Sequence, residues 1–290
     1  MIFFFLFLLI NICYIHVWYK FLDKVPTGIG IVLIVPCYFL YFEEQLYFLS
    51  TFLILTFTFI YFLDDLKGIH FLWRIMLQIL SSVVIFFSVS FDGNYIFLIL
   101  NLFFILVLVN VLNFQDGEDL NISTLLIMIF GVFYFYADLE FIKKTSQIIL
   151  LFLISFSFFN FKKNFLYFGD SGCYLISIII ALFAYSEMNN AILIKLLISV
   201  IIFPVIDVFY VIGYRILNKE NLLTRNYLHI YQIIAQKINS KLYLLPNMIL
   251  SFLNIFISFY IPLGINFIIF LVSVNISLLF IMRLIIKKSD

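Results

Sequence analysis

Long runs of apolar residues, separated by short polar stretches, make up most of the chain. The runs lie near residues 1–19, 29–42, 45–63, 71–91, 95–113, 121–137, 147–160, 172–186, 191–213, 245–261 and 265–283. A helix needs about 20 apolar residues to cross a bilayer, and in lipid only helices and closed barrels pair all their backbone polar groups. Because the runs lack the two-residue alternation of barrel strands, the pattern predicts an all-α polytopic membrane protein. We expect about 11 transmembrane helices, with about 10 as the alternative because some runs are short for a full crossing.

The composition agrees with this pattern and excludes other classes of protein. Of the 290 residues, 65% are apolar and 11% are charged, whereas a soluble domain is about half apolar and about a quarter charged. A water-soluble globule and a disordered chain are therefore excluded. Nucleic-acid binding would require a basic patch, and the net charge of +1 gives no indication of one.

The distribution of Lys and Arg predicts the orientation of the chain. If residue 1 lies outside, the outer side keeps only Lys143, Lys144 and Lys195 of the 17 basic residues. Basic residues concentrate on the cytosolic side of membrane proteins, so we expect the N-terminus outside, the C-terminus in the cytosol and a location in the inner (plasma) membrane. We expect a single membrane domain over residues 1–290, with one sizeable cytosolic segment near 214–243, in which residues 226–238 resemble an amphipathic helix.

The notable acidic residues fall on this same inner side. They are Asp64, Asp65, Asp116, Glu118, Asp119, Asp170 and Asp207. Acidic side chains at a membrane boundary are costly and often functional, so this one-sided grouping predicts a site on the cytosolic face.

The first acidic motif is the pair Asp64 and Asp65 at the inner end of the third run. Two adjacent carboxylates repel each other, so a cation or a cationic partner would stabilise them. Arg74 and Gln78, on the next run, are four residues apart and share a helix face. The structural alternative is a solvated helix end at which Lys67 pairs locally.

The second motif runs from Asn110 to Asp119. Asn110 and Asn113 put two amides on one helix face, and Gly117 permits a tight turn that presents Asp116 and Asp119 together. The alternative is an interhelical hydrogen bond followed by an ordinary polar loop.

The third motif, residues 168–174, places Gly169, Asp170, Ser171 and Gly172 directly before a helix. Free backbone N–H groups and the positive end of the helix dipole then lie beside a carboxylate, which suits a phosphate held by a bound divalent cation. The alternative is that Asp170 or Ser171 simply caps the helix.

The fourth motif extends from Pro204 and Asp207 through Arg215 to Arg225 and His229. Asp207 is either functional or a structural acid bonded to a neighbouring helix. His229, as a lone histidine in an amphipathic stretch, is compatible with simple packing as well as with phosphate binding.

In this order and on one side of the membrane, the motifs resemble the polyprenyl-phosphate N-acetylhexosamine-1-phosphate transferases of glycosyltransferase family 4, over roughly residues 20–232. The superfamily includes the phospho-N-acetylmuramoyl-pentapeptide transferase and the undecaprenyl-phosphate GlcNAc-1-phosphate transferases. Its aspartate pair, its Asn-x-x-Asn-x-x-Asp-Gly-x-Asp motif, its Gly-Asp-x-Gly motif and its Pro-Thr-x-Gly-Gly loop are matched in turn by Asp64 and Asp65, by residues 110–119, by residues 169–172 and by Lys24-Val25-Pro26-Thr27-Gly28.

The resemblance implies a reaction and a set of roles. The chain would transfer a HexNAc-1-phosphate from a UDP-N-acetylhexosamine to undecaprenyl phosphate and release UMP, initiating a cell-envelope polysaccharide such as an O-antigen of lipopolysaccharide or a teichoic acid. Mg²⁺, or alternatively Mn²⁺, would be the cofactor, held by Asp170 and Asp65. The resemblance assigns catalysis to Asp64, Asp65, Asp116 and Asp119, and substrate binding to Lys24, Thr27, Lys67, Asn110, Asn113, Arg225 and His229.

The chain also departs from the family pattern. Leu120 stands where the family usually has glycine, and Cys173 where it has serine. The family's histidine cluster is reduced to His229, with Arg225 nearby to supply part of the missing charge.

Two other functions remain open at this point: a transporter with an acidic inner-face site, and a relative of the transferases that has lost activity. Transporter sites tend to lie near the midplane between repeated halves, whereas these acids gather on one face and no repeat is visible. The sequence chooses neither the sugar donor nor the oligomeric state, and a homodimer is left open.

Overall fold

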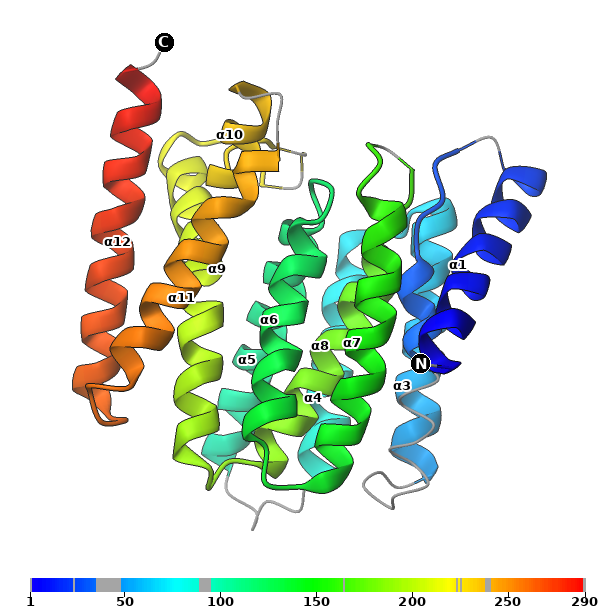
Figure 1. Cartoon of the computed structure of the whole chain (residues 1–290), viewed down its shortest axis with the longest axis horizontal. Coiled ribbons are helices and arrows are strands. Elements are labelled where there is room, and N and C mark those ends of the chain that lie inside the picture. Colours follow the sequence, from blue (N-terminus) through cyan, green and yellow to red (C-terminus); the bar gives the residue numbers. More distant parts are fainter. Residues whose placement is uncertain are drawn as a thin grey trace. The chain divides into compact units, whose positions relative to one another are not determined.

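The computed structural model describes residues 2–22, 24–34, 48–88, 95–163, 165–222, 224, 226–237 and 241–288. Within these ranges every regular element is a helix (Figure 1). The chain divides into two compact units, unit 1 over Met1–Met188 and unit 2 over Asn189–Asp290, and each is described by itself. That they form the single domain expected from the sequence stays a prediction.

Unit 1 contains the first helices of the chain. They are α1 (Ile2–Phe21), the short 3-10 helix η1 (Ile29–Leu33), α3 (Phe48–Lys67), α4 (Phe71–Ser88), α5 (Tyr95–Gln115), α6 (Asn121–Tyr136), α7 (Glu140–Asn160) and α8 (Gly169–Ser186).

Unit 2 contains the rest. They are α9 (Ala191–Leu217), α10 (Ile230–Lys237), the 3-10 helix η2 (Lys241–Leu244), α11 (Leu245–Ser258) and α12 (Ile265–Lys288).

The expectation of an all-helical polytopic membrane protein is confirmed. In the described part of the chain, 7 helical segments are long and apolar enough to cross a membrane, and α4 and α6 are shorter apolar helices. α3 has 20 residues but ends in Asp64, Asp65 and Lys67. The total of about 11 spans and the placing of the termini stay predictions, and part of the second expected run, near 29–42, lies outside the described residues.

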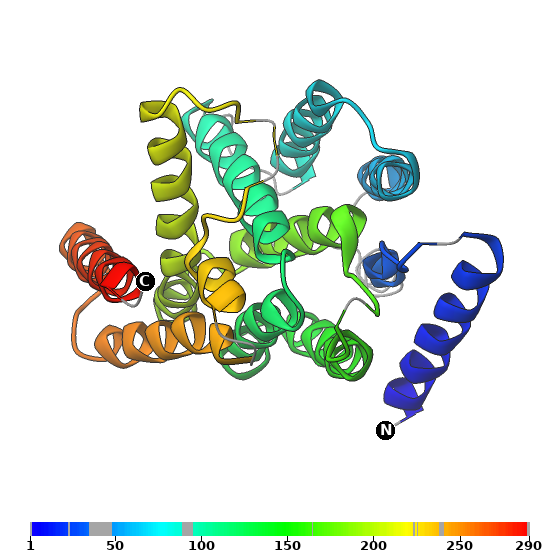
Figure 2. The same cartoon turned by 90° about the horizontal axis from the view of Figure 1, so that it is seen from above.

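α8 is the central helix of unit 1 (Figure 2). It packs against η1, α3 and α5, and all but one of its residues from Gly169 to Phe183 are buried. A helix that is apolar on every face lies either in a protein core or in lipid, and α8 is surrounded by other helices. Aromatic rings close one side of it, because Phe183 makes edge contacts with Phe130, Phe133 and Phe141.

Two helices begin earlier than the apolar pattern predicts. α7 begins at Glu140 rather than at 147, because the buried Glu187 carboxylate accepts the backbone N–H groups of Asp138 and Leu139 at 2.8 and 2.7 Å and stabilises the turn before the helix. α8 begins at Gly169 rather than at 172, so Asp170 lies in the first helical turn.

Unit 2 is held together by α9, which packs against α11 and α12. An apolar cluster joins these helices to α10 and contains Phe203, Ile206, Ile230, Leu250 and Leu279. The amides of Asn254 and Asn275 bond to each other in both directions at 3.2 and 2.9 Å. Such pairs satisfy amides that lipid would leave without partners.

Candidate active site

Asp65 joins the end of α3 to the beginning of α8. Its two carboxylate oxygens accept the backbone N–H groups of Asp170 and Ser171 at 2.8 and 3.1 Å, and the Ser171 hydroxyl at 2.6 Å. The first N–H groups of a helix have no partner within the helix, and a carboxylate there also interacts favourably with the dipole. A carboxylate 105 positions away therefore caps α8.

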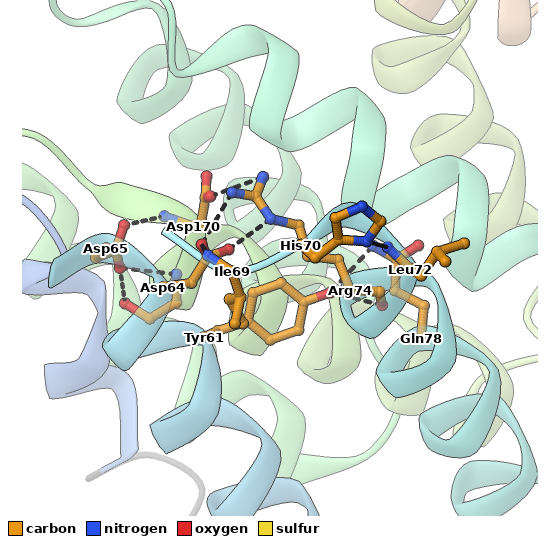
Figure 3. Close-up of polar contacts among 10 residues, drawn as sticks. Tyr61, Asp64, Asp65, Ile69, His70, Leu72, Arg74, Gln78 and Asp170 are labelled. Atoms are coloured by element: carbon orange, nitrogen blue, oxygen red, sulfur yellow. Dashed lines mark hydrogen bonds and ion pairs between the residues drawn. The ribbon is translucent and has the colours of Figure 1, made fainter. Parts of the chain in front are cut away.

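Arg74 lies between the carboxylates of Asp64 and Asp170 (Figure 3). Its Nε and Nη2 atoms contact the Asp64 carboxylate at 2.5 and 3.0 Å, and its Nη1 contacts Asp170 at 3.1 Å. The backbone N–H of Ile69 donates to Asp64 at 2.6 Å. The Asp64 side chain is fully buried, whereas that of Asp170 is 23% exposed, so Asp170 is the more accessible of the two.

Asp116 and Asn113 bring the end of α5 to the same place. The Asp116 carboxylate accepts the N–H of Gly169 at 2.9 Å, and the Asn113 side chain hydrogen-bonds to Asp170. Asp116 lies in the turn after α5. Burial raises the pKa of its carboxyl to about 8; the Gly169 hydrogen bond opposes this rise, and the negative charges of Asp170 and Asp65 add to it.

The loop before η1 completes the cluster by close backbone packing. Gly28 has φ +81°, and a Cβ atom there would lie 2.8 Å from the Asp65 carboxylate. A Cβ on Gly30 would lie 2.2 Å from the Cα of Gly172. The N–H of Gly30 donates to Phe168 O at 3.1 Å. Only glycine permits approaches this close. The glycines of the Gly-Asp-x-Gly motif, Gly169 and Gly172, therefore pack directly against Gly28 and Gly30.

A line of polar side chains supports Arg74 from within the bundle. Asn110 donates to Gln78, Gln78 donates to the Tyr61 hydroxyl, and Tyr61 donates to the backbone oxygen of Arg74, each at 3.1 Å. The Tyr61 ring stacks on Tyr174 of α8 at 4.5 Å between centroids. Asn110 therefore acts on the site through other side chains.

The donor set suits a divalent cation. Mg²⁺ is usually held by one or two carboxylates together with phosphate oxygens and water. Arg74 contacts Asp64 and Asp170, while Asp65 and Asp116 accept backbone N–H groups at the start of α8, beside Asp170. When the four carboxylates are ionised, their negative charge exceeds the positive charge of this guanidinium. No group of three His, Cys, Asp or Glu side chains within the described ranges forms a ready-made metal site. Asp170 is partly exposed, with 23% of its side chain accessible, so a cation could reach its carboxylate.

Residues 46–188 match the family model described as glycosyl transferase family 4. They form a glycosyl transferase family 4 domain. The match covers about half of the chain, ends where unit 1 ends, and includes Asp64, Asp65, Asp116 and Asp170. A comparison with curated proteins found no match. The family 4 domain makes the chain a membrane-embedded transferase and supports, in general terms, sugar-phosphate transfer to a polyprenyl phosphate.

Within the family 4 domain, the structure explains one departure from the family pattern. Leu120 adopts φ 63°, the left-handed region that favours glycine. Its N–H donates to the Asn160 side chain at 2.5 Å. The glycine expected there would adopt this conformation without strain, so the backbone shape is kept although the residue has changed. Asp119, next to it, is buried.

Of the remaining predicted residues, Lys67 lies within the matched range 46–188, and the others lie outside it. Lys24 and Lys67 are exposed and Thr27 is half-buried; the Thr27 carbonyl accepts the Tyr14 hydroxyl at 2.5 Å. Arg225 lies outside the described residues. His229 belongs to unit 2, beyond the matched residues.

His229 is buried against Asp207, its Nδ1 lying 2.9 Å from the Asp207 carboxylate. Arg283 of α12 donates to Asp207 at 3.0 Å and to the Leu228 carbonyl at 2.9 Å, and its guanidinium lies 4.1 Å from the Tyr210 ring centre. These contacts agree with the structural interpretation of Asp207 as an acid bonded to a neighbouring helix.

The sequence analysis did not assign roles to Arg283, Tyr61 or Glu187. Arg283 and Glu187 are charged residues within or beside apolar runs. The same feature indicated the acidic residues of the candidate site. Tyr61 carries no such signal, because one more aromatic residue in an aromatic-rich chain is not distinctive.

Proposed function

We propose that this protein transfers a HexNAc-1-phosphate from a UDP-N-acetylhexosamine to undecaprenyl phosphate, giving the polyprenyl diphosphate sugar and UMP. The observation that supports this most is the grouping of four motif carboxylates: Asp65 and Asp116 accept N–H groups from the first turn of α8, which carries Asp170, and Arg74 joins Asp170 to Asp64. These are the residues that the family motifs single out.

The side chains divide the work. Asp170 would hold Mg²⁺, or Mn²⁺ in its place, with Asp65 beside it fixing the turn from which Asp170 projects. The cation, when bound, would neutralise charge on the diphosphate as it breaks. Asn113, Asp116 and Asp119 would bind the nucleotide side of the donor, and Lys24, Thr27 and Lys67 would contact phosphate oxygens. The assignment of Arg225 and His229 to substrate binding stays a prediction from the resemblance.

The acceptor needs little activation. A phosphate monoester has a second pKa of about 6 and is mostly ionised near neutral pH, so the attacking oxygen requires positioning more than a strong base. Asp64 is fully buried and paired with Arg74, which suits a role in orienting Arg74 better than one in proton transfer.

The location of the reaction follows from its substrates. A lipid acceptor requires a site at the membrane surface, and a sugar nucleotide made in the cytosol requires the inner surface. The distribution of Lys and Arg supports the same side. The active site would therefore face the cytosol from the inner membrane.

The test is an assay of membranes that contain the full chain. Labelled UDP-GlcNAc, Mg²⁺ and undecaprenyl phosphate are incubated with them, and label is measured in the lipid fraction. UDP-GalNAc and other UDP-hexosamines are tested in parallel to identify the donor. We expect label to enter the lipid with at least one donor and to require the divalent cation.

Asp170→Asn should reduce the transfer to background while the protein still inserts. Asp138→Asn is the matched control, because it makes the same chemical change at an exposed position outside the cluster, and should leave transfer unchanged. Absence of transfer with every donor would refute the proposed function, and near-normal transfer by Asp170→Asn would remove Asp170 from the metal role.

A further inference from the structure

Arg74 holds its two carboxylate partners unequally. It contacts Asp64 through two nitrogens, at 2.5 and 3.0 Å, and Asp64 also accepts the Ile69 N–H. It contacts Asp170 through Nη1 alone, at 3.1 Å. The Asp64 side chain is fully buried and that of Asp170 is 23% exposed. The pair with Asp64 is therefore fixed, and the contact with Asp170 is the one that a ligand can reach.

The guanidinium geometry allows one contact to change while the other remains. Arg presents its N–H groups in a rigid planar fork, so one edge can hold a carboxylate while another nitrogen bonds elsewhere. Here Nε and Nη2 face Asp64 and Nη1 faces Asp170. Breaking the Nη1 contact requires no movement of the Asp64 pair.

The charges make the Arg74 and metal positions competitive. A carboxylate that already faces a guanidinium attracts a second cation less strongly, because the two positive charges repel. Asp170 is the residue proposed above as the metal ligand, and Arg74 is its cationic partner in the structure. The Asp170 carboxylate therefore cannot bind both Arg74 and a metal ion at full strength.

We propose that Arg74 is the internal counterion of Asp170, that a divalent cation displaces its Nη1 from this carboxylate, and that the released Nη1 then binds the diphosphate of the donor. This inference deepens the proposed function and rests on it for the identity of the diphosphate ligand. Arg74 would couple the two ligands, since occupation of Asp170 by a cation prepares the guanidinium for an anion. Coupling of two sites is reciprocal.

The test measures binding of two simple probes to the detergent-solubilised full chain, without lipid or sugar nucleotide. Mn²⁺ binding is followed by the electron paramagnetic resonance signal of the free ion, and binding of inorganic pyrophosphate is measured at saturating Mn²⁺. Removal of Arg74 alone would leave Asp64 as a buried charge without its partner and can prevent folding. The main variant is therefore the double substitution Asp64→Asn with Arg74→Gln, which replaces the ion pair by two neutral amides.

We expect this double variant to bind Mn²⁺ roughly tenfold more tightly than the wild type, within the range usual for two coupled sites, and pyrophosphate roughly tenfold more weakly. Opposite changes for the two probes distinguish the exchange from damage to the site, which would weaken both. Adding Asp170→Asn to the double variant should abolish the gain in Mn²⁺ affinity.

Lys20→Gln is the matched charge control, because it removes one positive charge from an exposed position in the last turn of α1, at a residue with no proposed role in binding. Screening by salt makes the effect of such a charge small, so its Mn²⁺ affinity should change less than about threefold. Unchanged or weaker Mn²⁺ binding by the double variant would overturn the inference, as would unchanged pyrophosphate binding. The proposed function is tested by the transferase assay, which uses other ligands. A failure of the proposed function can therefore be distinguished from a failure of this inference.

Discussion

Leu120 occupies a position at which the backbone conformation favours glycine. Its φ of 63° lies in the left-handed region, where a side chain costs about 1–2 kcal/mol. The turn after Asp116 needs this conformation to lead into α6, whose first turn includes the Thr124 N–H bond to Leu120 O at 2.9 Å. The chain keeps the turn at the expense of strain.

Replacing Leu120 by glycine and by alanine separates strain from packing. Both variants lose the leucine side chain, but only glycine removes the Cβ, so Leu120→Gly should be more stable than Leu120→Ala by about 1 kcal/mol. The measurement is the free energy of unfolding in denaturant. At Leu125, inside α6, the order should reverse, with alanine better than glycine by about 1 kcal/mol. The same order at both positions would show that Leu120 is not strained.

Asp116 predicts a dependence of stability on pH. Burial raises its pKa to about 8, while in the unfolded chain an aspartate has a pKa of about 3.9. Between these pH values the folded protein keeps a proton on Asp116 that the unfolded chain releases. Protonation of Asp116 therefore contributes fully to the free energy of unfolding below about pH 4, and this contribution is lost as the pH rises to about 8.

The melting temperature of the protein in a metal chelator should therefore fall between about pH 5 and pH 8. Asp116→Asn imitates the protonated carboxyl and should flatten this decline, while Asp138→Asn should leave it unchanged. A melting temperature that rises over this interval in the wild type, and is unaffected by Asp116→Asn, would contradict the assignment.

At the scale of elements, the site depends on how η1 and the start of α8 approach each other. The residues just before α8 form backbone hydrogen bonds with this region: Tyr167 N–H donates to Pro26 O, in the loop before η1, at 2.8 Å, and Gly30 N–H, within η1, donates to Phe168 O at 3.1 Å. Gly30 and Gly172 allow the two backbones to touch. The Asp65 cap and the position of Asp170 depend on this contact.

Gly30→Ala should separate η1 from α8. Its Cβ would lie 2.2 Å from the Gly172 Cα, and overpacking of this kind costs about 1–3 kcal/mol. We expect a loss of unfolding free energy of that size, together with reduced transfer in the lipid-labelling assay. Gly131→Ala is the matched control: a Cβ there meets nothing within 4 Å in α6, so the substitution should stabilise by about 0.5–1 kcal/mol. Equal effects at both glycines would refute the close-packing argument.

The sequence predicts the helices well and the contacts between them only through motifs. Apolar runs predicted the long described helices but not their exact ends. The early starts of α7 and α8 were missed because the Glu187 and Asp65 carboxylates that stabilise them come from distant parts of the chain. The carboxylates of the site were found because charged residues are rare in so apolar a chain. That Asp65 caps a helix, and that Gly30 meets Gly172, depends on tertiary packing that no local pattern records.

For the molecule as a whole, the family match and the acidic cluster belong to unit 1, while unit 2 has its own buried charge group. Asp207, His229 and Arg283 connect α9, the start of α10 and α12. Burying a carboxylate is costly unless it is paired. The histidine segment of this chain therefore depends on the last helix for its position.

Arg283→Met should destabilise unit 2, because it leaves the buried Asp207 carboxylate without its guanidinium. Breaking a buried pair costs about 3–5 kcal/mol. Hydrogen exchange should become faster in α10, with little change in α6. Lys237→Met removes an exposed lysine that donates to Ile286 O at 2.7 Å, and should cost less than about 1 kcal/mol. Unchanged exchange in α10 of Arg283→Met would show that the pair does not hold this segment.

The Asp65 cap also sets an order of events during synthesis. Its partner N–H group follows 105 positions later in the chain, and a ribosome adds about 5–20 residues per second. For roughly 5–20 s, then, a nascent chain contains the aspartate pair and Arg74 but not the helix that they organise. A translational arrest before residue 169 would leave Asp65 with none of its three donors from α8, so the acidic cluster becomes complete only when the last helix of the family 4 domain is inserted.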